Sequence, residues 1–268
     1  MRIKLNEIRV EIGGKLYKYY DIGNGDRVLV FLHGLAGSKE NQPKFYESLS
    51  PDFRCIFLDL PAHNNLPLYG IDSLSGFVDY FISFIDCLNL KRLGLIGFSL
   101  GGLIALEISK ELFIRGKMVP AVIWSAPINI IRSALSSKAS LLINAIGYLP
   151  RNIYLLMLRI DIVYKTLRNL RIVLLRHDKD ALISFNNISM VNISKVFKEK
   201  TGTNFSTPLL FIYGKNDPFV TKSAYDQLKF NNDLHEKLLI ERGGHFISQE
   251  GKDEGMLHIK DFFDRYLI

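Results

Sequence analysis

Six short apolar runs constrain the fold of this chain more than any other feature of its sequence. None contains a charged residue, and they lie at 28–32, 55–58, 93–96, 119–124, 209–213 and 238–240. Such runs are typical of strands that are buried on both faces, as in parallel sheets. Segments with helical apolar periodicity lie among them, at 71–90, 100–113, 221–230 and 251–266. Strands that alternate with helices predict βαβ units, and therefore an α/β fold with a mostly parallel sheet.

Turn and cap signals refine this outline. Residues 3–21 show β-like alternation around a turn at Gly13 and Gly14, which predicts a leading hairpin. Asp72 or Ser73 is the expected N-cap of the helix at 71–90, because its side chain can accept a hydrogen bond from the first turn.

The alternation of strands and helices stops between 127 and 207. This stretch has no clear buried-strand run, and its helical patterns fall at about 133–147, 151–164, 166–176 and 178–200. We interpret residues 128–206 as a helical cap that is inserted into a core made of residues 1–127 and 207–268. Several apolar side chains at 153–162 are expected to bury much of the cap. Most of them are expected to form helix–helix core, and a few can line an apolar pocket.

The positive charge of the chain is concentrated in this predicted cap. The formal net charge is +7, and residues 128–200 hold twelve Lys or Arg and four Asp or Glu. Six of the basic residues are Arg151, Arg159, Lys165, Arg168, Arg171 and Arg176. They can attract an anionic substrate or an anionic membrane surface, although a solvated helix face has the same composition. No nucleic-acid module is recognisable, so we predict no nucleic-acid partner.

Cysteine usage and the chain start suggest a simple cellular context. Cys55 and Cys87 form no CxxC motif or Cys/His cluster, so we expect two buried thiols, no metal and no cofactor. The first residues lack a signal-peptide core, and no window approaches the ~18 apolar residues of a membrane span. We therefore expect a cytoplasmic protein without a transmembrane segment.

The strongest chemical motif is Gly-Phe-Ser-Leu-Gly at 97–101. It follows a predicted strand directly and precedes a predicted helix, which is the context that a nucleophile elbow requires. Gly97 and Gly101 allow the tight turn that lifts the hydroxyl of Ser99 above the sheet. Ser99 is therefore the predicted nucleophile.

A serine hydroxyl needs a base, and the base needs an orienting acid. His245 lies in a glycine-rich loop after the last predicted strand, and Asp217 lies in the loop after the strand at 209–213. The carboxyl ends of parallel strands share one edge of a sheet, so both side chains can reach Ser99. The chain order Ser99, Asp217, His245 predicts a catalytic triad.

An oxyanion hole requires two backbone N–H groups. One is expected from Leu100, directly after the nucleophile. The other is expected from Leu35, in the loop after the strand at 28–32. Gly34 allows this backbone to turn inward, and His33 is expected to support the loop rather than to act as the base.

Together these motifs resemble the α/β-hydrolase fold superfamily, in its capped single-domain type. The matching segments are 33–34, 59–63, 97–102, 214–217 and 243–245. The resemblance implies an eight-stranded sheet with an antiparallel second strand, a cap after the sixth strand and the triad roles given above. The chain departs from the family at Ala62-His63-Asn64, where Gly-His-Gly is common, and we interpret His63 as structural.

The reaction class follows from the serine at the elbow, because the epoxide hydrolases and haloalkane dehalogenases of this fold carry aspartate there. We predict a hydrolase of carboxylic esters or thioesters with an apolar acyl part, acting through an acyl-enzyme on a small, lipid-like or anionic substrate. Two alternatives stay open. One is a carbon–carbon bond hydrolase that uses the same triad, and the other is a non-catalytic ligand-binding member of the fold.

Overall fold

The computed structural model describes residues 5–35, 37–41, 48–128, 196, 206–217, 220, 222–228, 230, 232–245 and 249–268. The predicted helical cap at 128–206 lies almost entirely outside these residues, so the cap and the domain bounds stay predictions. The described residues include the sheet, helices on both of its faces and every predicted site residue.

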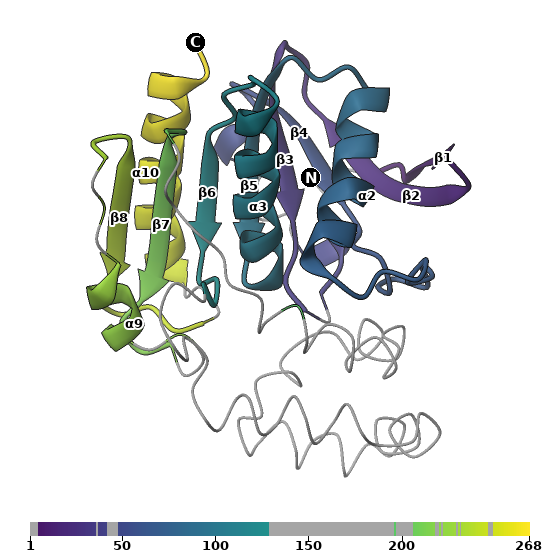
Figure 1. Ribbon diagram of the computed structural model, residues 1–268. Helices are drawn as coiled ribbons and strands as arrows, with labels where there is room; N and C mark the ends of the chain where they lie inside the picture. Colours follow the sequence, from purple (N-terminus) through teal and green to yellow (C-terminus); the bar gives the residue numbers. More distant parts are fainter. Residues whose placement is uncertain are drawn as a thin grey trace, which may run out of the picture.

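An eight-stranded sheet forms the centre of the molecule, in the order β1-β2-β4-β3-β5-β6-β7-β8 (Figure 1). Its strands are β1 (Ile8–Ile12), β2 (Lys15–Ile22), β3 (Arg27–Leu32), β4 (Arg54–Leu58), β5 (Arg92–Phe98), β6 (Ala121–Trp124), β7 (Leu209–Gly214) and β8 (His235–Ile240). β2 is antiparallel to β1 and β4, and the other neighbouring strands are parallel. The predicted α/β fold is therefore confirmed, with its mostly parallel sheet and antiparallel second strand.

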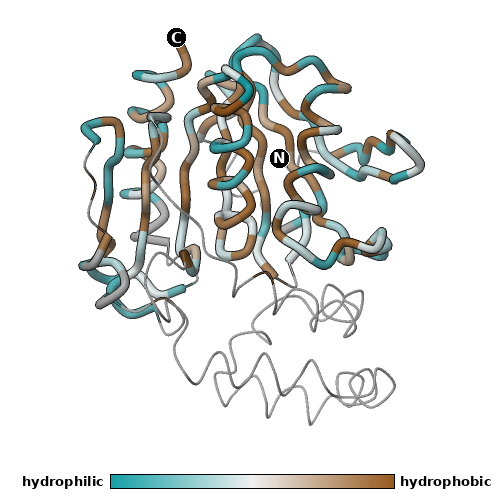
Figure 2. The backbone as a smooth tube through the Cα atoms, viewed as in Figure 1, coloured by the Kyte–Doolittle hydropathy of each residue, from teal (hydrophilic) through white to brown (hydrophobic). Residues whose placement is uncertain are grey.

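Helices cover both faces of the sheet (Figure 1). The described helices are η1 (Lys39–Asn41), α2 (Leu74–Cys87), α3 (Leu100–Ile114), α9 (Lys222–Gln227) and α10 (Gln249–Tyr266). In β3, Val28 and Val30 share an apolar cluster with α2 and α3, whereas Leu29 and Phe31 share one with α10. Because successive side chains of a strand point to opposite faces, a continuous apolar run is what a sheet between two helical layers requires (Figure 2).

The ends of α2 show how local signals set a helix. Ser73 is the N-cap, and its hydroxyl accepts a hydrogen bond from the Gly76 N–H at 3.2 Å. This decides between the two predicted caps in favour of Ser73. The helix is shorter than the predicted 71–90, because the chain turns beyond Cys87 and Asn89 adopts a φ of 49°.

The two cysteines differ in their exposure. Cys55 lies buried in β4, as predicted, but Cys87 is exposed, so the prediction of two buried thiols is wrong. Cys87 is the last residue of α2 and follows Asp86, which is also exposed. Among the described helices, none is long and apolar enough to span a membrane.

Candidate active site

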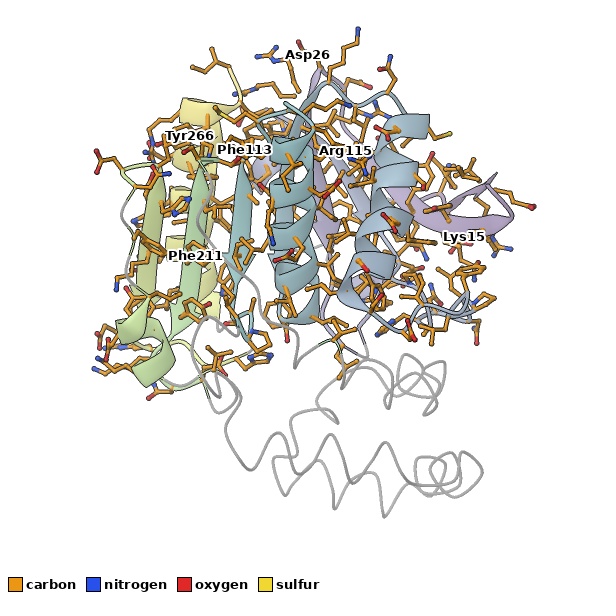
Figure 3. The ribbon with its side chains drawn as sticks, viewed as in Figure 1. Lys15, Asp26, Phe113, Arg115, Phe211 and Tyr266 are labelled. Carbon is orange, nitrogen blue, oxygen red and sulfur yellow. The ribbon has the colours of Figure 1, made fainter. Side chains whose placement is uncertain are left out.

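The predicted site residues lie at the edge of the sheet where the parallel strands end. Ser99 follows β5, Asp217 follows β7, His245 follows β8, and the loop with Leu35 follows β3. Figure 3 shows Asp26 and Arg115 at the opposite edge of the molecule. Parallel pairing of β3, β5, β6, β7 and β8 brings these separate loops together at one edge.

The nucleophile turn is strained and held by close backbone packing. Ser99 has φ 53° and ψ −116°, and its N–H donates to the Trp124 carbonyl at 2.8 Å. A Cβ on Gly97 would lie 2.2 Å from the Gly101 oxygen, and one on Gly101 would lie 2.1 Å from the Leu32 oxygen. Only glycine fits at both positions, so the Gly-x-Ser-x-Gly spacing is a steric requirement of this turn.

The three predicted triad side chains meet in a hydrogen-bonded chain. His245 Nε2 lies 3.1 Å from Ser99 Oγ, and His245 Nδ1 lies 2.8 Å from Asp217 Oδ2. The carboxylate can only accept, so Nδ1 carries the proton and Nε2 is free to accept the serine O–H. None of the three residues is more than 9% exposed, so these polar interactions are largely shielded from water.

The loops that carry Asp217 and His245 pack directly on each other. The Asn216 N–H donates to the Gly243 carbonyl at 2.9 Å, and a Cβ on Gly214 would lie 2.5 Å from the Gly244 oxygen. The Val220 N–H donates to Asp217 Oδ1 at 3.0 Å, which leaves Oδ2 directed at His245. Backbone contacts therefore fix the acid and the base in one arrangement.

The loop after β3 carries Leu35, the first predicted oxyanion donor, and is held by its own hydrogen bonds. The Gly34 carbonyl accepts the Gly37 N–H at 3.0 Å and lies 2.8 Å from His33 Nδ1. The Leu60 N–H donates to His33 Nε2 at 3.0 Å, so Nδ1 is the nitrogen that donates to Gly34. N–H and C=O point in opposite directions across a trans peptide, so the Leu35 N–H is turned away from these contacts.

The second predicted donor lies at the start of α3. Leu100 is the first residue of that helix, so its N–H has no acceptor one turn earlier within the helix. A Cβ on Gly34 would lie 3.2 Å from the Ser99 Cβ, which places the loop after β3 beside Ser99. The two predicted donors, Leu35 and Leu100, therefore flank Ser99.

The remaining histidine of this region has a structural environment. His63 is 1% exposed, and its Nδ1 lies 2.9 Å from the Pro61 carbonyl. Its ring meets the His33 ring edge-on at a centroid distance of 5.0 Å. Burial and these contacts agree with the interpretation of His63 as a structural residue.

One feature beside the site was missed by the sequence analysis. The side chain of Lys39 is 0% exposed and is surrounded by the carboxylates of Glu7, Glu40 and Asp59. Asp59 belongs to a matched family segment, but the lysine carries no motif. Its contacts join residues that are distant in the sequence, so no local signal could have found this cluster.

Comparison with known proteins identifies the fold. A family model described as "alpha/beta hydrolase fold" matches residues 27–127. The chain has the α/β-hydrolase fold. A solved lipase from Acinetobacter baumannii AYE, described as putative, aligns with a TM-score of 0.72 and 20% identity, over 98% of this chain and 92% of its own. The meta-cleavage product hydrolase of Pseudomonas fluorescens IP01 aligns with a TM-score of 0.68 and 20% identity, over 97% of this chain and 98% of its own.

Curated relatives match a shorter part of this chain. The dihydrolipoyllysine-residue acetyltransferase component of the acetoin cleaving system from Pseudomonas putida is 31% identical over 106 residues. That match covers 38% of this chain and 28% of the relative. The next relatives are matched over 32% to 35% of their length, so these matches leave most of each relative unaligned.

Proposed function

We propose that this α/β-hydrolase cleaves a carboxylic ester or thioester with an apolar acyl part. The observation that carries the proposal is the chain of hydrogen bonds from Asp217 through His245 to Ser99. A base within 3.1 Å of a serine hydroxyl, itself oriented by a buried carboxylate, is the arrangement that activates serine for acyl transfer.

The proposed reaction proceeds in two halves. Ser99 Oγ attacks the substrate carbonyl carbon while its proton passes to His245 Nε2, and Asp217 stabilises the resulting imidazolium. The carbonyl oxygen becomes an oxyanion, and the N–H groups of Leu35 and Leu100 donate to it. Collapse expels the alcohol or thiol, which takes the proton from His245. Water then attacks the acyl-enzyme by the same route and releases the acid.

The backbone donors are expected to supply a large part of the rate enhancement. Loss of one oxyanion donor costs about 10²–10³-fold in kcat in enzymes of this type. The Leu35 donor depends on the Gly34 peptide, whose carbonyl is held by Gly37 and His33. Both hydrogen bonds are made within the protein itself, as electrostatic preorganisation requires.

A carbon–carbon bond hydrolase is the second candidate. The likeness to the meta-cleavage product hydrolase favours it, and the same triad serves both reactions. Turnover of a ring-cleavage diketone with no ester hydrolysis would support this candidate. A non-catalytic ligand-binding role is the third reading, and the complete triad argues against it.

Substrate selection is proposed to depend on the segment at 128–206. We expect its basic residues to favour anionic esters, so neutralising Arg168 and Arg171 should raise KM for anionic esters more than for neutral ones. Equal changes in KM for both ester classes would contradict this proposal. The residues concerned lie outside the described part of the chain.

Covalent labelling tests the proposed nucleophile directly. A fluorophosphonate probe should modify Ser99, and peptide mass spectrometry should place the adduct there. The Ser99→Ala variant should lose labelling and the hydrolysis of short p-nitrophenyl esters. Ser109→Ala is the matched control, because Ser109 is a buried serine of the same helix that donates to the Val119 carbonyl. Folded wild-type protein without labelling would overturn the proposal.

A further inference from the structure

A fully buried lysine lies beside the oxyanion loop. Lys39 Nζ is 2.7 Å from Glu7 Oε2, 2.8 Å from Glu40 Oε1 and 2.8 Å from Asp59 Oδ2. The Tyr20 ring lies against it, with its centroid 5.1 Å from Nζ. We call these four charged side chains the Lys39 cage. A buried ammonium is costly unless it is paired, and here three carboxylates pair with it.

The cage joins three segments that are far apart in the chain. Glu7 precedes β1, Lys39 and Glu40 begin η1 in the loop after β3, and Asp59 directly follows β4. Carboxylate oxygens of the three acids lie within 4.8 Å of one another, a spacing that suits a metal ion. The ammonium already contacts all three acids, so the cage contains its own cation. Burial opposes a charged lysine, but Asp59 and the other two acids outweigh it and raise the pKa of Lys39.

Two hydrogen bonds, made by the neighbouring residues Asp59 and Leu60, connect the cage to the oxyanion loop. Asp59 Oδ1 accepts the backbone N–H of Lys39 at 2.9 Å. The next residue, Leu60, donates its N–H to His33 Nε2 at 3.0 Å. Both ends of the loop at 33–39 are thus held by residues 59 and 60. The peptide that carries the Leu35 N–H lies between these two anchors.

We propose that Lys39 is a positioning residue for the oxyanion hole, whose ammonium holds the loop at 33–39 with the Leu35 N–H directed towards Ser99. This inference rests on the proposed hydrolase function. Lys39 does not touch the reacting atoms and acts through Asp59. Without the ammonium, three neighbouring carboxylates would repel one another, and the turn at 59–60 would release the loop.

The test replaces Lys39 with methionine, which keeps much of the side-chain volume and removes the charge. Arg54→Met is the matched control, because Arg54 forms a two-pronged ion pair with Asp21 at the start of β4, away from the loop. Both variants should lower the melting temperature. Lys39→Met alone should lower kcat for a p-nitrophenyl ester by about 10–100-fold, with KM within about twofold, since a misplaced oxyanion donor weakens mainly the transition state.

Two further measurements make the test independent of folding losses and of turnover. Binding of a boronic acid that adds to the nucleophile should weaken by the same factor as kcat/KM. Amide hydrogen exchange at 33–38, measured without substrate, should accelerate in Lys39→Met but not in Arg54→Met. If Lys39→Met does not fold, Glu7→Gln serves in its place. It removes one partly exposed carboxylate from the cage, so it should give a smaller effect of the same kind.

The outcomes separate this inference from the proposed function. If Lys39→Met and Arg54→Met lose kcat equally, or if exchange at 33–38 stays unchanged, the positioning role is wrong. If the wild type neither hydrolyses esters nor reacts with the fluorophosphonate, the hydrolase proposal fails. In that case, faster amide exchange in Lys39→Met still supports the proposal that Lys39 holds the loop at 33–39, and unchanged exchange overturns it.

Discussion

Replacing Gly101 with alanine tests the contact between the nucleophile turn and the oxyanion loop. The added Cβ would lie 2.1 Å from the Leu32 oxygen and 2.5 Å from the His33 oxygen. Ordinary van der Waals contact begins near 3.4 Å, and both obstructing atoms belong to the backbone. The start of α3 must therefore move by about 1 Å relative to the end of β3.

Two opposing effects set the expected change in stability, and a third sets the expected change in kcat. Alanine is better than glycine inside a helix by about 1 kcal/mol. Overpacking a tight site costs about 1–3 kcal/mol, so Gly101→Ala should be neutral to about 2 kcal/mol less stable. A displacement of about 1 Å between the nucleophile and the oxyanion donor should reduce kcat by about 100-fold.

Gly76→Ala is the matched control for this prediction. Gly76 is also a helical glycine, but its added Cβ would meet the Ile71 side chain at 3.1 Å instead of backbone. We expect this variant to keep wild-type kcat and to be as stable as the wild type or more so. Urea unfolding and ester hydrolysis measure both quantities. A Gly101→Ala variant with wild-type kcat and raised stability would refute the steric reasoning.

Three further predictions concern the triad acid, acid stability and the cysteines. Asp217→Asn should reduce kcat by about 10⁴-fold, because an amide favours the wrong imidazole tautomer; a loss under about tenfold would contradict the role of the acid. Burial would raise the pKa of Glu7 and Glu40, but the ammonium of the Lys39 cage outweighs burial and lowers both pKa values below 4.5. The two glutamates therefore stabilise the fold fully above about pH 4.5, and this stabilisation is lost as pH falls through their lowered pKa values. A free energy of unfolding that stays constant from about pH 6 to about pH 3 would contradict this pH dependence. Iodoacetamide should alkylate Cys87 in the native protein, whereas Cys55, whose pKa burial raises to about 12, should react only after unfolding.

The fold was predictable because each central strand is buried on both faces. A strand between two helical layers needs apolar side chains at successive positions, and 28–32 or 209–213 meet that need without ambiguity. The turn at 97–101 was predictable for a different reason. A Cβ at either glycine would lie 2.1 Å or 2.2 Å from a backbone oxygen, so no other residue fits at these two positions.

Features that depend on contacts between distant residues could not be predicted in this way. The Lys39 cage joins positions 7, 39, 40 and 59, and each of these residues alone is an ordinary surface residue type. The exposure of Cys87 depends on where α2 ends, and element ends are set by the turn at Asn89 rather than by apolar periodicity. Asp217 and His245 could be selected from the acids and histidines of the chain only because both follow predicted strands and come in the expected order.

The contacts of Gly101 and Gly34 imply that Ser99 and the loop after β3 position each other. Gly101 packs against the carbonyls of Leu32 and His33, while Gly34 packs against Ser99 itself. A positive φ at a serine costs free energy, and the donated hydrogen bond from the Ser99 N–H to Trp124 helps to hold it. All of these contacts lie within the sheet edge and its loops. Under the proposed function, changes confined to 129–195 should therefore alter which esters are hydrolysed, while these contacts around Ser99 stay unchanged.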